Sequence, residues 1–159
     1  MISILRDFKE ITASRAYIKK LGLSFKKPSL YNRIAAKDWI GLEPVGDINK
    51  SWDLHEALNT IRTSDLDFSS PVLDMGAYGS EMPKILNSFG FKDISVVDLN
   101  SRISHPNHGF DFCKDILIGD MYESKTYGKK RFKLITSFSV LEHGYDQDKF
   151  VAIIDKILS

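Results

Sequence analysis

The chain has 159 residues, of which 43% are hydrophobic and 27% are charged, a composition typical of one globular domain with an apolar core. Its 22 Lys and Arg residues nearly balance its 21 Asp and Glu residues, so the net charge of +1 gives no field that would attract nucleic acid or an anionic membrane. The single Cys113 cannot form an internal disulfide bond, and no apolar run is long enough to span a membrane. We therefore expect a cytoplasmic protein whose partner is a small molecule or a protein surface.

Residues 1–70 are expected to form an N-terminal extension of helices and irregular chain. A first helix lies between Met1 and Gly22, and its apolar face consists of Ile4, Phe8, Ile11, Ile18 and Leu21. Pro and Gly residues interrupt any regular period from Ser24 to Lys50, which predicts a wrapping segment or lid. A second helix begins at Ser51, and its inner stripe consists of Leu54, Leu58 and Ile61.

Residues 71–159 are expected to form the core, because short apolar runs there alternate with turns and helices. Helices are predicted over Ser80–Gly90 and over Asp146–Leu158. Strands are predicted over Pro71–Gly76, Ile94–Leu99, a third segment near Phe110, and Phe132–Leu141. This order predicts an α/β fold, a Rossmann-like parallel sheet with flanking helices.

The segment VLDMGAYGSEMP, Val72–Pro83, places a glycine-bearing turn between the first strand and its helix. In a parallel sheet, ligands bind at the carboxyl ends of the strands, where this turn lies. A dinucleotide-binding loop needs glycine at three positions counted from Gly76, and two of them hold Tyr78 and Glu81. Asp74 would repel a pyrophosphate but attract an ammonium group. The loop therefore disfavours a nicotinamide-dependent oxidoreductase and favours a ligand that has positive charge and no phosphates.

Four stretches, taken together and in order, resemble the class I S-adenosylmethionine (SAM)-dependent methyltransferase family: VLDMGAYGSEMPKIL, VVDLN, FCKDI and FKLITSFSVLEHG. The resemblance implies SAM as the cofactor and transfer of its methyl group to an unidentified acceptor. It also implies a SAM site formed by Asp74, Gly76, Tyr78, Gly79, Asp98, Leu99, Asp115, Ile116 and Ser137. Within that site, the residues from Asp74 to Gly79 would surround the methionine end, and Asp98 would bind the ribose hydroxyls.

The residue that meets the adenine depends on where the third strand lies. If the strand covers Phe110–Lys114, the resemblance places Asp115 and Ile116 at the adenine. If the strand covers Ile116–Gly119, Asp120 takes that position. We favour Asp115, and both alternatives stay open on the sequence alone.

Glu142 and His143 directly follow the fourth strand, where the family positions its substrate, and they are the candidates for a catalytic role. Methyl transfer depends mainly on aligning a nucleophile with the sulfonium methyl group, so a structural role for this pair in holding the loop is equally compatible. No metal site is expected, because His105, His108 and the single thiol of Cys113 have no paired carboxylate motif beside them.

The chain departs from the family after the fourth strand and its helix, where the family continues with further strands. The resemblance implies a sheet ordered third, second, first, fourth, with the long apolar fourth strand as an open edge. A shortened gene product, a fragment, or an edge covered by the N-terminal segment or by another chain would each account for this, and the last includes a homo-oligomer. The alternative function is a catalytically inactive SAM-binding or protein-interaction module.

Overall fold

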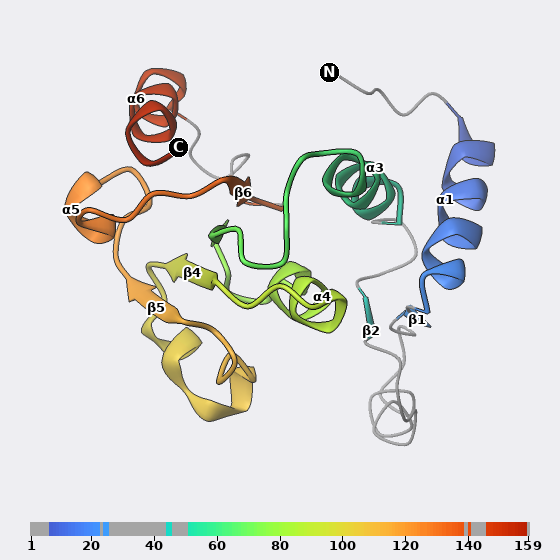
Figure 1. Cartoon of the computed structure of the whole chain (residues 1–159), viewed down its shortest axis with the longest axis horizontal. Coiled ribbons are helices and arrows are strands. Elements are labelled where there is room, and N and C mark those ends of the chain that lie inside the picture. Colours follow the sequence, from blue (N-terminus) through green and yellow to red (C-terminus); the bar gives the residue numbers. More distant parts are fainter. Residues whose placement is uncertain are drawn as a thin grey trace. The chain divides into compact units, whose positions relative to one another are not determined.

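The computed structural model describes residues 7–22, 24–25, 44–45, 51–138, 140 and 146–158 (Figure 1). The chain divides into two units, Met1–Asp65 and Leu66–Ser159. The first unit contains α1 (Phe8–Lys20), β1 (Ser24–Phe25), β2 (Pro44–Val45) and α3 (Ser51–Arg62). The second contains β3 (Val72–Met75), α4 (Met82–Phe89), β4 (Ile94–Asp98), η3 (Ser101–Ser104), η4 (Pro106–His108), β5 (Asp115–Ile118), α5 (Ser124–Tyr127), β6 (Leu134–Thr136) and α6 (Gln147–Ile157). No described helix has both the length and the apolar character that a membrane crossing requires.

The first unit is built on the contact between α1 and α3. Asp7 fixes the start of α1, because its carboxylate accepts hydrogen bonds from the amides of Lys9 and Glu10 at 2.7 and 3.2 Å. Both predicted helices are confirmed, and the buried apolar residues on them are Ile18, Leu54, Leu58 and Ile61. Residues 1–6 lie outside the described residues. The same holds for most of the predicted wrapping segment, of which β1 and β2 are described and pair in parallel.

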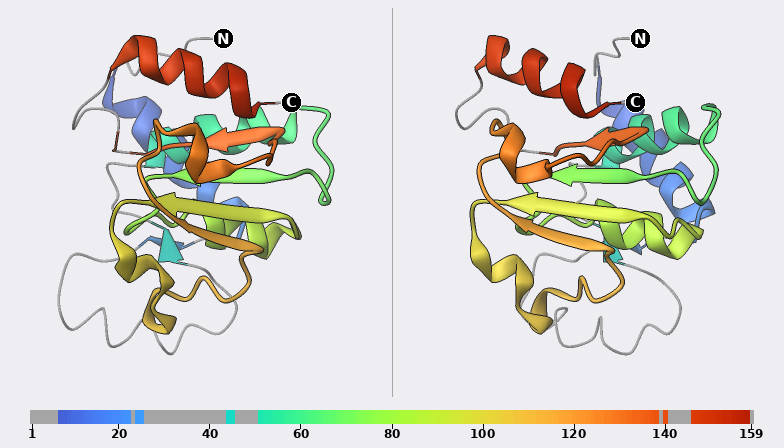
Figure 2. Two further views of the ribbon diagram at one scale, coloured as in Figure 1. Left: turned by 90° about the vertical axis from the view of Figure 1, so that its left-hand side faces the viewer. Right: turned by 60° about the vertical axis from the view of Figure 1, so that its left-hand side comes forward.

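The second unit contains a four-stranded sheet ordered β5-β4-β3-β6, in which every pair of neighbours is parallel (Figure 2). The predicted α/β, Rossmann-like arrangement and its strand order are therefore confirmed. The chain adds β4 and then β5 on one side of β3, and it returns to place β6 on the other side. Open parallel sheets bind their ligands at the carboxyl ends of the strands where the order reverses, which in this sheet is beside β3.

Among the described residues, alternate side chains of the strands pack into hydrophobic clusters on both faces of the sheet. On one face, Leu73 and Val97 pack with Tyr127 of α5 and Ile153 and Ile157 of α6. The second cluster, on the other face, consists of Ala77, Val96, Ile103 and Phe110. Because β3 and β4 are covered on both faces, their sequences read as continuous apolar runs.

Local signals set the ends of α4 and α6, and both helix predictions are confirmed. Pro83 stands in the first turn of α4, where its missing N–H costs no hydrogen bond. Gly90 ends α4 in the left-handed conformation, with φ of 111°, and its amide donates to the last turn. Asp146 caps α6 by accepting a hydrogen bond from the amide of Lys149 at 3.1 Å.

The bounds favoured for the third strand are wrong. β5 begins at Asp115, so the residues from Phe110 to Lys114 precede it. Phe110 and Phe112, which alternate like strand residues, instead anchor this segment on the sheet as part of the cluster around Val96. Tertiary burial of these two rings produces the alternation that indicated a strand.

The fourth strand is also shorter than its apolar sequence predicts. β6 covers Leu134–Thr136, whereas the prediction ran from Phe132 to Leu141. Just before β6, the amide of Phe132 donates to the carbonyl of Ile157 at 2.7 Å, and Phe132 forms an isolated parallel bridge with Leu158. Within the described residues, β6 is therefore a short strand at the edge of the sheet.

Candidate functional site

The carboxyl ends of β3 and β4 are joined by a tight glycine-bearing loop over residues 76–80. The amides of Gly76 and Ala77 both donate to the carbonyl of Val97, at 2.9 and 3.1 Å, which holds the loop against the end of β4. Gly76 has a φ of +78°, and a Cβ there would approach Val140 to 2.3 Å. Gly79 also has a positive φ, of +83°, but a Cβ there would meet nothing within 4 Å. Gly76 is thus required by both conformation and space, and Gly79 by conformation alone.

Asp74 lies near the carboxyl end of β3, two residues before this loop, and is 1% exposed. Its Oδ1 accepts a hydrogen bond of 2.6 Å from the hydroxyl of Thr136. Its Oδ2 is buried and, in the described part of the chain, has no partner at hydrogen-bond distance; the same is true of Ser80 Oγ. A buried carboxylate oxygen without a partner is costly, and such groups are frequent where a ligand completes the site.

Burial raises the pKa of Asp74 from its ordinary value of 3.8 to about 6. Loss of hydration is the largest cause, and the negative charge of Asp98 acts in the same direction. The hydroxyl of Thr136 opposes the rise, because its hydrogen bond stabilises the ionised form, and the hydroxyl of Ser80 acts in the same direction although it lies outside hydrogen-bond distance. The pKa of Asp74 is therefore close enough to neutral pH that a nearby cation would determine whether the carboxyl group is ionised.

Asp98 ends β4 and accepts hydrogen bonds from two backbone segments, the loop after β3 and the turn after β4. Its Oδ2 accepts a hydrogen bond from the amide of Tyr78 at 2.9 Å, and its Oδ1 accepts one from the amide of Asn100 at 2.7 Å. Sequence reasoning assigned Asp98 to a ligand and missed this role in fastening the loop to β4. A carboxylate has about four lone-pair sites, so its acceptor capacity is not exhausted by two amides.

Three exposed apolar side chains belong to the residues next to Asp98. Tyr78, whose amide bonds to Asp98, is 47% exposed; Leu99 follows Asp98 and is 74% exposed; Ile118 pairs with Asp98 in the sheet and is 47% exposed. The ring of Tyr78 lies beside that of His108, with the centroids 5.2 Å apart. Tyr78 therefore projects from the loop toward His108 and solvent, and it is not buried inside the loop.

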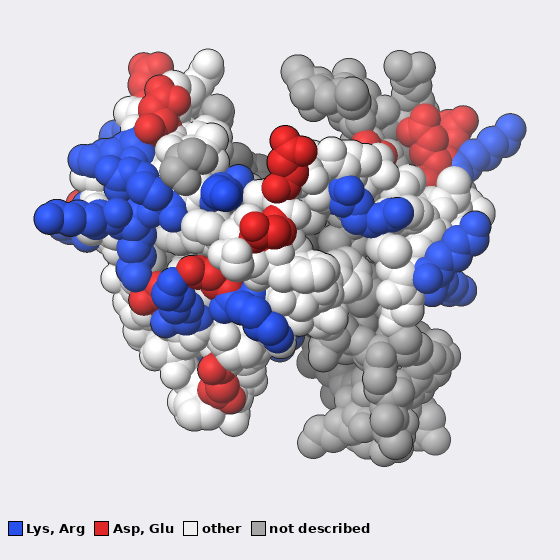
Figure 3. All heavy atoms as spheres, in the orientation of Figure 1, with Lys and Arg blue, Asp and Glu red and all other residues white. Residues whose placement is uncertain are grey.

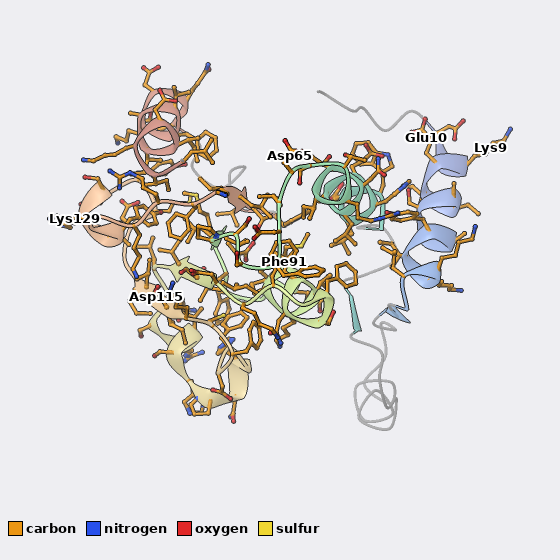
Figure 4. The ribbon with its side chains drawn as sticks, in the orientation of Figure 1. Lys9, Glu10, Asp65, Phe91, Asp115 and Lys129 are labelled. Atoms are coloured by element: carbon orange, nitrogen blue, oxygen red, sulfur yellow. The ribbon has the colours of Figure 1, made fainter. Side chains whose placement is uncertain are left out.

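The favoured strand over Phe110–Lys114 would place Asp115 and Ile116 at the edge of the sheet formed by the carboxyl ends of the strands, here called the carboxyl edge. That placement is wrong. Asp115 is the first residue of β5, at the opposite edge of the sheet, and it is labelled in Figure 4. There it forms an ion pair with Lys130 at 2.6 Å and accepts a hydrogen bond from Ser95 at 3.2 Å. The bond from Lys130 is the largest cause that lowers the pKa of Asp115. Ile116 lies inside β5, paired with Val96.

Asp120, the alternative to Asp115, follows the carboxyl end of β5. The amide of Gly119 donates to the carbonyl of Asp98 at 3.0 Å, which fixes this turn beside the end of β4. Asp120 Oδ1 accepts a hydrogen bond from the amide of Tyr122 at 2.9 Å. At the end of β6, the hydroxyl of Ser137 donates to the carbonyl of Met75 at 3.0 Å. The carboxyl edge thus unites residues from all four strands.

The remaining candidates are Glu142, His143 and the residues considered for a metal site. Glu142 and His143 lie outside the described residues. Among the residues that the structure describes, no three His, Cys, Asp or Glu side chains converge in a way that would hold a metal ion. Burial, and then the charge of Asp74, raises the pKa of Cys113 to about 12, so its thiol stays protonated and unreactive near neutral pH.

No protein-family model matches the chain, and no curated protein matches it. The geometry of the carboxyl edge and the motifs that resemble the methyltransferase family are the features that indicate a function.

Proposed function

We propose that the chain binds SAM at the carboxyl edge of β3 and β4 and transfers its methyl group to an acceptor. The observation that carries the proposal is the buried carboxyl group of Asp74, whose Oδ2 has no partner among the described residues. A ligand that brings an ammonium group to this oxygen would satisfy it and would favour the ionised form of Asp74. SAM carries such an ammonium group at its methionine end.

The loop supports a ligand without phosphates for a second reason. Phosphate-binding loops use free backbone amides at the start of a helix. Here the amides of Gly76 and Ala77 donate to Val97, that of Tyr78 donates to Asp98, and that of Ser80 donates to the carbonyl of Ala77. Four of the five amides in the loop are therefore used within the fold, which argues against a dinucleotide.

The residues around Asp98 support an adenosine group beside the methionine end. The unused acceptor capacity of Asp98 suits two ribose hydroxyls, and exposed Leu99 and Ile118 offer apolar surface for a flat base. We assign the adenine amino group to Asp120 in place of Asp115, because Asp120 follows the carboxyl end of β5. The same proposal includes Glu142 and His143 as candidates for the residues that position the acceptor. It also includes a cytoplasmic location and the pairing of two copies of the chain through β6.

Calorimetric titration with SAM, and separately with NAD, tests the proposal. We expect binding of SAM alone, and a folded protein that does not bind SAM would refute the proposal. Asp98→Ala is expected to weaken SAM binding by roughly 1–3 kcal/mol, the scale for lost hydrogen bonds to a charged group. Asp115→Ala is the matched control, because it removes a carboxylate from the opposite edge of the sheet and should leave SAM affinity unchanged.

A SAM-binding module without turnover is the second candidate. It is favoured by the two backbone hydrogen bonds of Asp98, which give this residue a structural role that needs no catalysis. Release of S-adenosylhomocysteine in the presence of candidate acceptors separates the two functions. Binding of SAM without any release, across small-molecule and protein acceptors, would favour the module.

A further inference from the structure

Thr136 lies beside Asp74 in the sheet, although 62 positions separate them in the chain. Both residues are buried, with Thr136 7% exposed and Asp74 1% exposed. The hydroxyl of Thr136 is 2.6 Å from Asp74 Oδ1 and 3.5 Å from the carbonyl of Leu73. A hydroxyl has a single proton to donate, and the shorter contact indicates that it goes to Asp74.

This bond fixes one oxygen of the carboxylate and leaves the other for a ligand. Thr is branched at Cβ and restricted at χ1, so its hydroxyl is held in place within β6. The next residue of the chain, Ser137, bonds to the carbonyl of Met75 and holds the end of β6 against the end of β3. Asp74 Oδ2, by contrast, has no partner at hydrogen-bond distance within the described residues.

In the part of the chain that the structure describes, the charge that acts on Asp74 is the negative charge of Asp98. Asp98 at the end of β4 raises the pKa of Asp74. The charge of Asp74 in turn raises the pKa of Cys113, which lies on the segment before β5. The residues of β6, Leu134–Thr136, carry no charge. No described Lys or Arg forms an ion pair with Asp74. Within the described residues, the hydrogen bond that favours the ionised form of Asp74 therefore comes from Thr136.

We infer that Thr136 is a positioning residue for the cationic group of the ligand: its hydroxyl holds Asp74 Oδ1, so that Oδ2 is presented to the ligand's ammonium group. The inference rests on the proposed function. Because Thr136 belongs to β6, this strand would favour binding of a cationic ligand over a neutral one. The side chain of Thr136 acts through Asp74 and has no contact with the ligand of its own.

The first test needs no ligand. Thr136→Val keeps the shape of the side chain and removes the hydroxyl, while Thr136→Ser keeps the hydroxyl and removes the methyl group. The carboxyl carbon of Asp74 is followed by NMR during a pH titration of each folded protein. We expect Thr136→Val to raise the midpoint by about one pH unit, since the ionised form loses a hydrogen bond, and Thr136→Ser to stay near wild type.

The second test measures SAM affinity by calorimetry between pH 6 and pH 8. We expect Thr136→Val to bind about tenfold more weakly near pH 6.5, with a smaller difference at pH 8, where Asp74 is more fully ionised in both proteins. Thr136→Ser should restore most of the affinity. A merely structural role for Thr136 would not produce this dependence on pH.

The two hypotheses can fail separately. If wild type does not bind SAM, the proposed function fails, and the ligand-free titration still tests the role of Thr136. An unchanged Asp74 midpoint in folded Thr136→Val would overturn the inference. If Thr136→Val does not fold, as judged by circular dichroism, Thr136→Ala replaces it and is expected to raise the midpoint in the same direction.

Discussion

At the scale of single residues, Asp74 is a group that the fold tolerates at a cost. Its pKa rises to about 6 in the folded chain because burial removes water from the carboxylate. A raised pKa means that the folded state binds the proton more tightly than the unfolded chain does. The resulting stabilisation is fully present below the ordinary pKa of 3.8 and is lost as the pH rises through about 6.

Asp74→Asn is therefore expected to stabilise the ligand-free protein at pH 8. A difference between pKa values of 3.8 and about 6 corresponds to a gain on the order of 3 kcal/mol, because Asn keeps an oxygen for Thr136 and carries no charge. Urea unfolding at pH 8 and at pH 3.5 measures this gain, which should vanish at the lower pH. The same variant should lose SAM binding.

Asp115→Asn is the control with the opposite sign. Lys130 lowers the pKa of Asp115, so the ionised form of Asp115 stabilises the fold above its unfolded pKa, and this stabilisation is lost as the pH falls through the lowered value. The substitution should lower the free energy of unfolding at pH 7 by a small amount, because the pair is partly exposed to solvent. A stability gain in both variants would contradict the assignment of the raised pKa to Asp74.

At the scale of elements, the loop between β3 and α4 offers a matched pair of glycines. Gly76→Ala and Gly79→Ala both place a side chain at positive φ, which costs roughly 1–2 kcal/mol. Only Gly76→Ala also drives a Cβ into Val140, and overpacking of this kind adds roughly 1–3 kcal/mol. Thermal unfolding is expected to rank wild type above Gly79→Ala and Gly79→Ala above Gly76→Ala. Equal losses would mean that Val140 moves aside freely.

The helices and strands that were predicted correctly are those whose ends are determined by residues within or next to the element itself. Gly90 ends α4, Asp146 caps α6, and the runs of β3 and β4 are apolar because both faces are buried. The positions of Asp74 and Asp98 near the carboxyl ends of β3 and β4 follow from the same apolar runs.

The start of β5 could not be predicted, because the segment from Phe110 to Ile118 contains two short runs that both suit a strand. Pairing of Ser95 with Asp115 decides between them, and that pairing is a tertiary event. For the same reason, the sequence did not reveal the bond from Thr136 to Asp74. Nor did it reveal the bond from Tyr78 to Asp98, since each joins residues far apart in the chain.

At the scale of the second unit as a whole, the two edges of the sheet carry different charge. Asp74, Asp98 and Asp120 belong to the carboxyl edge. Exposed basic side chains gather over the part that carries α5 in Figure 3. Two basic residues belong to the opposite edge: the amide of Lys133 donates to the carbonyl of Pro71, just before β3, and Lys130 forms its ion pair with Asp115 at the start of β5. Strands of four to five residues separate the two edges by roughly 13–17 Å, which exceeds the Debye length of about 8 Å at physiological ionic strength.

The basic residues are therefore expected to have little influence on a cation at the carboxyl edge. A double variant, Lys129→Gln with Lys133→Gln, should change SAM affinity by less than about twofold in physiological salt, where the distance screens the interaction. Calorimetry at low and physiological salt measures this. A large effect at physiological salt would place the SAM site nearer to the basic residues than we propose.

The pairing of β3 with β6 also has a consequence for the newly made chain. Synthesis delivers β3, β4 and β5 before β6, yet the hydroxyl that holds Asp74 comes from Thr136 in β6. Until Thr136 has been synthesised, Asp74 Oδ1 lacks the hydroxyl that holds it in the complete sheet. We expect a nascent chain stalled before β6 to contain the loop and Asp98 without a fixed Asp74 carboxylate, so that recognition of a cationic ligand would be complete only when the fourth strand of the sheet arrives.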